Sequence, residues 1–254
     1  MQSIAVIAIN TFRETVRDKI LYNLLVFAAF LMGISVLLAD LTIMEHRRIV
    51  TDIGLAAINL VGVMIAIFVG IGLVSKEIEK RTIYTIMARP ISRTQFVVGK
   101  YCGLSCVLLL NLLIMMVVFV GMMQVYRAPV HGSIFQAVQL IFVELLLVTA
   151  VAMLFSTFSS STLSAILTVA VYVIGHLTTD LKGVADKSKS EIAKLVMNGL
   201  YYLSPNLEML NIKGQAAVGK TVSLSYQALT SLYGLSYTAL LIVAACWVFQ
   251  RRDF

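Results

Sequence analysis

The sequence predicts an all-α integral membrane protein, built from an N-terminal amphipathic helix and six transmembrane helices. Of the 254 residues, 59% are hydrophobic and only 13% are charged, whereas a soluble domain is nearer half apolar and a quarter charged. The apolar residues gather in long runs with few charges inside them, which is typical of membrane helices. We expect a single transmembrane domain that covers residues 1–254.

Residues 2–19 predict an amphipathic helix that lies in the membrane interface. Apolar residues recur at every fourth position, from Ile4 through Ala8 and Phe12 to Val16, while polar and charged residues occupy the opposite face. The charged residues follow the apolar ones and no small-residue cleavage site is present, so the segment lacks the pattern of a signal peptide.

Six apolar runs are long enough, at roughly 20 residues each, to cross a membrane as helices. They are Ile20–Leu38, Ile53–Val74, Tyr101–Met123, Ala137–Ser156, Leu163–Thr179 and Leu229–Phe249. An even number of crossings puts both termini on one side. We expect that side to be cytoplasmic, because its Lys and Arg residues directly adjoin the ends of the spans.

The longest segment between two predicted spans, residues 180–228, is expected on the external side. Residues 191–203 have apolar side chains at helical spacing, and Ser-Pro-Asn at 204–206 follows as a helix break. We expect a short helix over the outer end of the bundle. Gly214–Thr221 matches the phosphate-binding pattern G-x-x-x-x-G-K-[ST], but without a surrounding strand-rich domain we expect a turn there.

One dense polar segment, Lys76–Lys100, interrupts the apolar chain and holds six of its 20 Lys and Arg residues. Lys76–Ala88 contains no helix breaker, which predicts a helix that ends before Pro90. Ser92 and Gln95 have the spacing of a capping box, which predicts a second helix that continues into the next span. This cytoplasmic region, residues 75–100, is then two helices anchored by spans. A solvated loop with the usual inside charge fits the composition equally well.

A set of charged, polar, proline and glycine residues in this region follows the order found in a known family: Glu79, Arg81, Thr82, Pro90, Ser92, Arg93, Gly99 and Lys100. With the elbow-like helix at 2–19 and the charged tail at 249–254, the pattern resembles the permease subunits of ABC exporters of the second-class, or type V, family. Residues 204–208 are similar to the subgroup that includes the permease of the nitrous-oxide-reductase maturation system. One position departs from the pattern, because many relatives carry Gly where this chain has Arg81.

The resemblance implies a transporter subunit that has no catalytic residues and no cofactor of its own. Two copies of an ABC ATPase subunit would bind ATP and Mg in the cytoplasm and act on two copies of this chain in a bacterial inner membrane. The contact with the ATPase would come from the coupling residues Glu77, Glu79, Arg81, Thr82, Ile83 and Ile86. Closure of the ATPase dimer would then rearrange the spans. Membrane lipid is a further partner, and nucleic acid is not expected.

Four polar residues lie within the predicted spans: Asn59, Asn111, Glu144 and His176. A carboxylate at the depth of Glu144 is costly and must face protein, water or a partner. It fits either a substrate or proton contact in the central path of a dimer or a hydrogen-bonded packing residue. The two asparagines and the histidine are more typical of hydrogen bonds between helices.

No metal site is expected. Cys102 and Cys106 share a helix face, as a pair of soft-metal ligands would, but such spacing is more typical of small residues at a helix contact. The methionine pairs at 115–116 and 122–123 do not share one face, which disfavours copper.

The main alternative to an exporter is a non-transporting membrane scaffold that transmits ATPase motion to a periplasmic partner through residues 180–228. A secondary transporter is less well supported, because it usually needs helices broken near the middle of the membrane. A membrane-embedded enzyme has the least support, because the sequence offers no catalytic or metal cluster with usable spacing.

Overall fold

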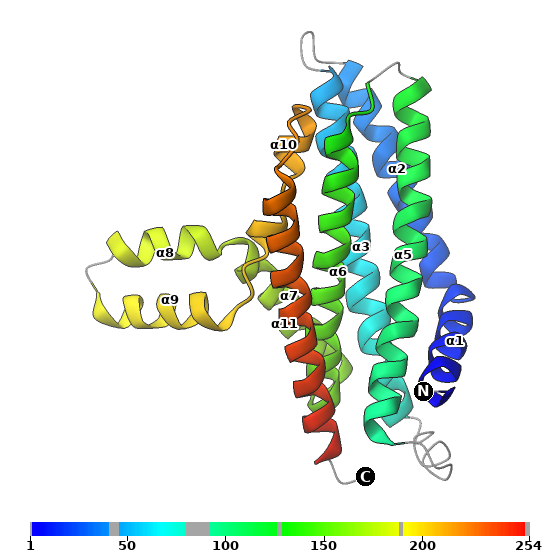
Figure 1. The fold of residues 1–254 in the computed structure, drawn as a ribbon, viewed down its shortest axis with the longest axis vertical. Helices are drawn as coiled ribbons and strands as arrows, with labels where there is room; N and C mark the ends of the chain where they lie inside the picture. The colour runs from blue at the N-terminus through cyan, green and yellow to red at the C-terminus, as the bar shows by residue number, and fades with distance from the viewer. Residues whose placement is uncertain (1, 41–45, 80–91, 126–128, 188–189, 252–254) are drawn as a thin grey trace.

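The computed structural model describes residues 2–40, 46–79, 92–125, 129–187 and 190–251, and no strand occurs among them. Long helices run side by side along the longest axis of the molecule, and two shorter helices project from one side (Figure 1). The described elements are α1 (Gln2–Val16), α2 (Lys19–Asp40), α3 (His46–Glu79), α5 (Arg93–Val125), α6 (Gly132–Phe158), α7 (Ser161–His176), α8 (Thr178–Lys187), α9 (Glu191–Leu203), η1 (Glu208–Leu210), α10 (Lys213–Ala217) and α11 (Leu224–Gln250). The predicted all-helical fold is confirmed.

Four of the described helices are long and apolar enough to cross a membrane. They are Arg48–Gly72 within α3, and α5, α6 and α11. Two further apolar helices, Lys19–Ile34 within α2 and α7, are shorter. The 16 residues of α7 extend for about 24 Å, which is less than the roughly 30 Å of a hydrocarbon core. The spans predicted at α3, α5, α6 and α11 are therefore supported by length and composition, while crossing by α2 and α7 stays a prediction.

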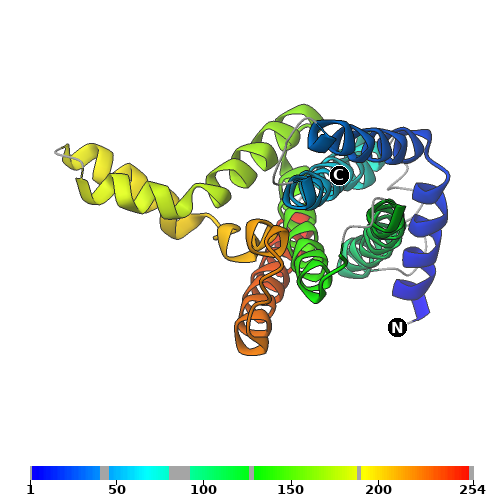
Figure 2. The ribbon, with the colours of Figure 1, turned by 90° about the horizontal axis from the view of Figure 1, so that it is seen from above.

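Helix α6 forms the centre of the bundle. It packs against α3, α5, α7, α10 and α11, and the view from above places it between α3 and α11 (Figure 2). In the most apolar window of α6, 78% of the residues are buried, against 28% in α11. Helix α6 is therefore the core helix, whereas α11 packs at the periphery of the subunit.

The described chain begins and ends at the same end of the bundle. This end also holds the last turn of α3, the first turn of α5 and the connection between α6 and α7 (Figure 1). The last turn of α2, the first turn of α3, the last turn of α5 and the first turn of α6 lie at the opposite end. The described chain ends, the end of α3 and the start of α5 therefore share one end of the bundle, while the side of the membrane on which they lie stays a prediction.

The helix of the second predicted span continues beyond it into the charged region. Helix α3 runs without a break through Lys76 to Glu79, so no separate helix begins at Lys76. Good helix formers on both sides of this position let the membrane helix continue into the charged region. The rest of the expected helix, up to Ala88, lies outside the described residues.

The segment predicted as an external loop, residues 180–228, contains several helices. Helix α9 covers Glu191–Leu203 as predicted, and α8 is a helix that the sequence analysis missed. Helix α8 begins at Thr178, so the predicted fifth span, which extended to Thr179, ends earlier than expected. Together α8 and α9 form a hairpin that projects sideways from the bundle, rather than lying over its end (Figures 1 and 2).

The chain between α9 and α11 is partly irregular but well covered. Leu207, Leu210 and Ile212 are at most 2% exposed, and α10 packs on α3 and α6. Irregular backbone at membrane depth is tolerated where protein covers it. This segment therefore continues the path of α7 towards the end of the bundle where α11 begins (Figure 1).

Candidate functional site: a buried polar network and the base of the charged region

The structure brings together three of the four polar residues predicted within the spans. Glu144 lies on α6 and is completely buried. Asn59 on α3 donates through Nδ2 to Glu144 Oε2 at 3.1 Å. His176, the last residue of α7, places Nε2 at 2.9 Å from Glu144 Oε1. Both oxygens of the Glu144 carboxyl group therefore have partners, and this one group links three helices.

A second carboxyl group continues the network on the other side of the imidazole. His176 Nδ1 lies 3.3 Å from Glu208 Oε2, and Asn211 Nδ2 donates to both Glu208 oxygens at 3.2 and 3.1 Å. A neutral imidazole carries one N–H and can donate to only one of the two carboxylates. A neutral His176 therefore serves one carboxylate as donor, whereas a protonated His176 donates to both Glu144 and Glu208. Of the two acidic side chains only Glu144 is fully buried, while the side chain of Glu208 is 42% exposed.

Close packing at Gly175 places Glu208 beside His176. The carbonyl oxygen of Gly175 accepts a hydrogen bond from the N–H of Leu207 at 3.0 Å. A Cβ atom at position 175 would lie 2.8 Å from Leu207 Cγ and 2.8 Å from the carbonyl oxygen of Pro205. Because any larger residue would displace this backbone, the glycine fixes how the segment after α9 meets the end of α7.

The fourth predicted residue, Asn111, is not part of this network. Its Nδ2 donates to the carbonyl oxygen of Val107 in the same helix at 2.8 Å, and its buried Oδ1 has no hydrogen-bond partner among the described residues. The network instead contains Glu208 and Asn211, which were not predicted. Glu208 belongs to the motif at 204–208, but its loop position conceals that it packs against the end of a membrane helix.

The first turn of α5 has the predicted capping box. The N–H of Gln95 donates to Ser92 Oγ at 3.2 Å, and the N–H of Ser92 donates to Gln95 Oε1 at 3.3 Å. Arg93 Nη1 donates to the carbonyl oxygens of Phe249 and Gln250 at 3.4 and 2.9 Å. These carbonyl groups belong to the last turn of α11, which leaves acceptors without helical partners. The start of α5 is therefore tied to the end of α11.

Two glycines on α5 let α1 pack closely against it. A Cβ atom at Gly99 would lie 2.8 Å from side-chain atoms of α1, and one at Gly103 would lie 2.6 Å from the carbonyl oxygen of Ala8. Lys100 lies between the two glycines, is only 5% exposed, and places Nζ at 3.9 Å from Glu14 Oε2. The predicted Gly-Lys motif thus forms the contact between α5 and the N-terminal amphipathic helix.

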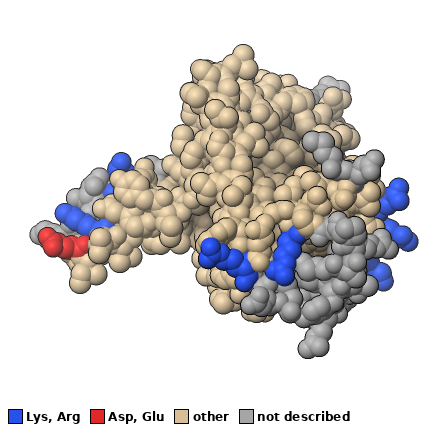
Figure 3. Space-filling model, turned by 60° about the horizontal axis from the view of Figure 1, so that its bottom comes forward, with Lys and Arg blue, Asp and Glu red and all other residues tan. Residues whose placement is uncertain are grey.

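The structure describes two of the six predicted coupling residues. Four of them lie outside the described residues: Arg81, Thr82, Ile83 and Ile86. Two lie at the end of α3, which the structure describes as helix through its last residue: Glu77 and Glu79. Described Lys and Arg side chains lie on this end of the bundle and on the hairpin (Figure 3). The chain thus leaves α3 at a positively charged end of the molecule.

Residues Gly214–Thr221, which match the phosphate-binding pattern, lie in a short helix and a turn. Helix α10 ends at Ala217, and Gly219 turns the chain with a φ of 74°. The N–H of Lys220 donates to the carbonyl oxygen of Gln215 at 3.0 Å. In the described chain no strand precedes the motif, so it lacks the strand–loop–helix context of a nucleotide site. The described residues also contain no group of three His, Cys, Asp or Glu side chains arranged for a metal.

These features define a polytopic helical membrane protein in which the end of α3, the start of α5 and the described chain ends meet at one end of the bundle. The family profile described as ABC-2 family transporter protein matches residues 5–254, and the chain belongs to this family. It is therefore a multi-pass membrane protein and a transmembrane subunit of an ABC transporter, and the family implies an ABC ATPase as its partner. A search of curated proteins found no match.

Proposed function

We propose that the chain is the transmembrane subunit of an ATP-driven exporter in a bacterial inner membrane, with both termini in the cytoplasm. Membership of the ABC-2 family supports a transporter subunit. The observation that carries the proposal is that the end of α3, the start of α5 and both chain ends share one positively charged end of the bundle (Figures 1 and 3). Basic residues at span ends are typical of the cytoplasmic side, where an ATPase would reach residues 76–92.

Helix α3 offers a direct path from this segment into the bundle. It is continuous from Asn59 to Glu79, a distance of about 30 Å along the helix. Asn59 holds Glu144 on α6, and Glu144 holds His176 at the root of the α8–α9 hairpin. Movement of α3 by the ATPase would therefore shift the polar network and the hairpin with it, as coupling through a packed and hydrogen-bonded element requires.

Helix α5 offers a second path from the same segment. Its first turn is bonded to α11 through Arg93, and Gly99 and Gly103 hold α1 against it. A tilt of α5 would therefore carry α1 and α11 along. We propose that two copies of the chain, each with one ATPase subunit, form the substrate path at their contact.

The hairpin favours a second function, that of a scaffold that moves an external partner without transporting a substrate. The apolar residues Ile192 and Leu195 on α9 are 77% and 75% exposed, and such a face is typical of an interaction surface. The motif at 204–208 supports placing the chain near the permease subgroup of the nitrous-oxide-reductase maturation system.

Reconstitution with the ATPase encoded beside this chain tests the proposed function. We expect a stable complex of full-length subunits and ATP hydrolysis that rises several-fold over the ATPase alone. An active ATPase that neither binds the chain nor responds to it would contradict the proposal. ATP-dependent substrate movement into inside-out vesicles would support the exporter. The scaffold would be supported if the wild type moves no substrate but binds a periplasmic protein. A variant with serine in place of Ile192 and Leu195 should then fail to bind that protein.

A further inference from the structure

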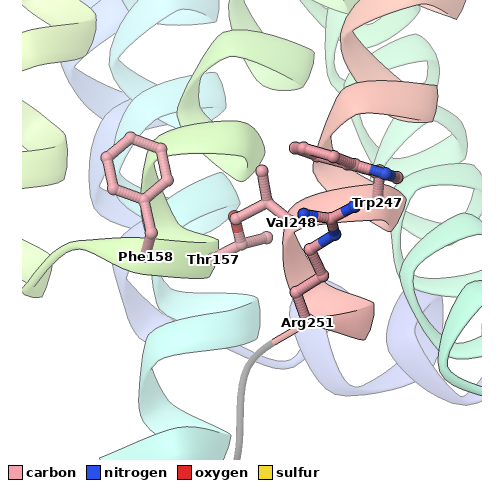
Figure 4. Close-up of a pocket in the computed structure, with 5 residues that line it drawn as sticks. All are labelled: Thr157, Phe158, Trp247, Val248 and Arg251. Carbon is pink, nitrogen blue, oxygen red and sulfur yellow. The ribbon is translucent and has the colours of Figure 1, made fainter.

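An open pocket of about 430 Å³ lies between the last turns of α6 and α11. Its lining residues are Thr157, Phe158, Trp247, Val248 and Arg251 (Figure 4). The guanidinium of Arg251 lies over the indole of Trp247, with Cζ at 4.0 Å from the ring centroid. The pocket lies at the end of the bundle that carries both chain ends (Figure 1), so it is separate from the polar network at His176.

The charge of the pocket favours an anion. Of its five lining residues, only Arg251 carries a charge. Helices α6 and α11 both end here, and each helix C-terminus carries about half of a negative elementary charge. Arg93 offsets these ends, because its guanidinium donates to the last carbonyl groups of α11. The two guanidinium groups contribute two positive charges, and the two helix C-termini together contribute about one negative charge. The described groups around the pocket therefore have a net charge of about one positive.

Apolar surface continues from the pocket along α11. Trp247, Val243 and Leu240 are 54%, 69% and 63% exposed. Their spacing of four and three residues places them on one face of the helix. Tryptophan at the end of a span is typical of the membrane–water interface. A phosphate next to Arg251 with an acyl chain along this face fits a phospholipid, whereas a free phosphate would leave the apolar face unused.

We propose that this pocket binds the headgroup of an anionic phospholipid, with Arg251 contacting the phosphate and Trp247 lying beside the glycerol backbone. A lipid at this place contacts α6 and α11 together, next to the Arg93 link between α5 and α11. It would therefore stabilise the end of the bundle from which the charged region leaves.

The chain reports on this pocket through its own fluorescence, because Trp247 is its only tryptophan. The full-length protein is reconstituted in phosphatidylcholine vesicles, and phosphatidylglycerol with bromine atoms near the headgroup end of its acyl chains is added as a quencher. Brominated phosphatidylcholine is the reference. One basic side chain near an anionic headgroup typically enriches that lipid about fivefold. We expect half-maximal quenching at an about fivefold lower mole fraction of the brominated phosphatidylglycerol.

Substitutions assign this preference to the pocket. Arg251→Gln is expected to abolish the difference between the two lipids, and Arg251→Lys to retain part of it. Arg13→Gln, at an exposed position on α1, is expected to leave the difference unchanged. Circular dichroism of each variant verifies that it is folded. Competition by unbrominated phosphatidylglycerol, which should restore the fluorescence of the wild type, requires no substitution at all.

Three results would overturn the proposal. Equal quenching by the two lipids in the wild type would show that the pocket does not select an anionic headgroup. Protection of Trp247 by inorganic phosphate would assign the pocket to a free anion. Resistance of Trp247 to both brominated lipids would show that a second copy of the chain or another protein covers it.

Discussion

Helices α1 and α9 are both amphipathic, but they relate differently to the rest of the subunit. Helix α1 packs along α5, where Gly99 and Gly103 leave no room for a side chain. Helix α9 packs mainly on its neighbour α8, and its apolar residues Ile192 and Leu195 stay exposed. An apolar helix face is therefore covered within this subunit where a membrane helix presents small residues to it. The hairpin is held at its root instead, where the polar network ends.

The largest effect on the stability of the subunit is expected from removing Glu144, which holds His176 at the base of the hairpin. Glu144→Ala removes the group that partners both Asn59 and His176, and each buried polar group left without its partner typically costs about 1–3 kcal/mol. The apparent melting temperature of the purified subunit, followed by circular dichroism, should therefore fall strongly. Asn111→Ala is the control, because it removes a hydrogen bond within its own helix, worth about 1 kcal/mol. Equal effects of the two variants would contradict the network.

The next largest effect is expected where α1 meets α5. Gly103→Leu drives a side chain into the backbone of α1 at Ala8, and overpacking of this kind costs about 1–3 kcal/mol. Trypsin should then cleave at Arg13 and Arg17 faster than in the wild type. Gly121→Leu on the same helix has no atom within 4 Å of the new Cβ and should leave cleavage unchanged. If Gly103→Leu is cleaved no faster than Gly121→Leu or the wild type, the close packing at the glycines is not what holds α1 on α5.

A smaller effect is expected at the link between α5 and α11. Arg93→Gln removes charged hydrogen bonds to the carbonyl groups of Phe249 and Gln250. Bonds of this kind contribute about 1.5 kcal/mol when partly exposed, so the melting temperature should fall by less than in Glu144→Ala. The matched change Arg17→Gln, at an exposed position between α1 and α2, should have no measurable effect. A melting temperature of Arg93→Gln equal to that of the wild type would argue against the link.

The smallest effect on the isolated subunit is expected on α9. Replacing Ile192 and Leu195 together by serine should change the free energy of unfolding by less than about 0.5 kcal/mol, because both side chains are already exposed. Leu207→Ser, at a position only 1% exposed, is the positive control and should destabilise the subunit clearly. A large loss of stability in the α9 variant would mean that its apolar face packs within the subunit.

Local patterns in the sequence predicted the parts of the fold that depend on neighbouring residues. The capping box at Ser92 and Gln95 is confirmed, as is the helix at Glu191–Leu203. Both depend on interactions within a few residues or on helical spacing. The early end of α7 at His176 was missed, because the apolar run continues past the point where Leu207 packs against Gly175.

The polar network could be predicted only in part. Asn59, Glu144 and His176 stood out because each is a polar residue within an apolar run. That they meet depends on which helices pack together, which no local pattern shows. Glu208 carried no such contrast, because it lies outside the predicted spans in a stretch that mixes polar and apolar residues, so its place beside His176 was visible only in three dimensions.

The central claim is that the segment following α3 receives the ATPase, and Glu79→Lys tests it most directly. This substitution reverses a charge at the last residue of α3. The measurement is the ATP hydrolysis that full-length chain stimulates in the partner ATPase after reconstitution. We predict that Glu79→Lys loses the complex and the stimulation while its membrane insertion and melting temperature stay unchanged, and that Glu191→Lys, the same change on the hairpin, keeps both. A Glu79→Lys variant that assembles and stimulates ATP hydrolysis like the wild type would contradict the claim.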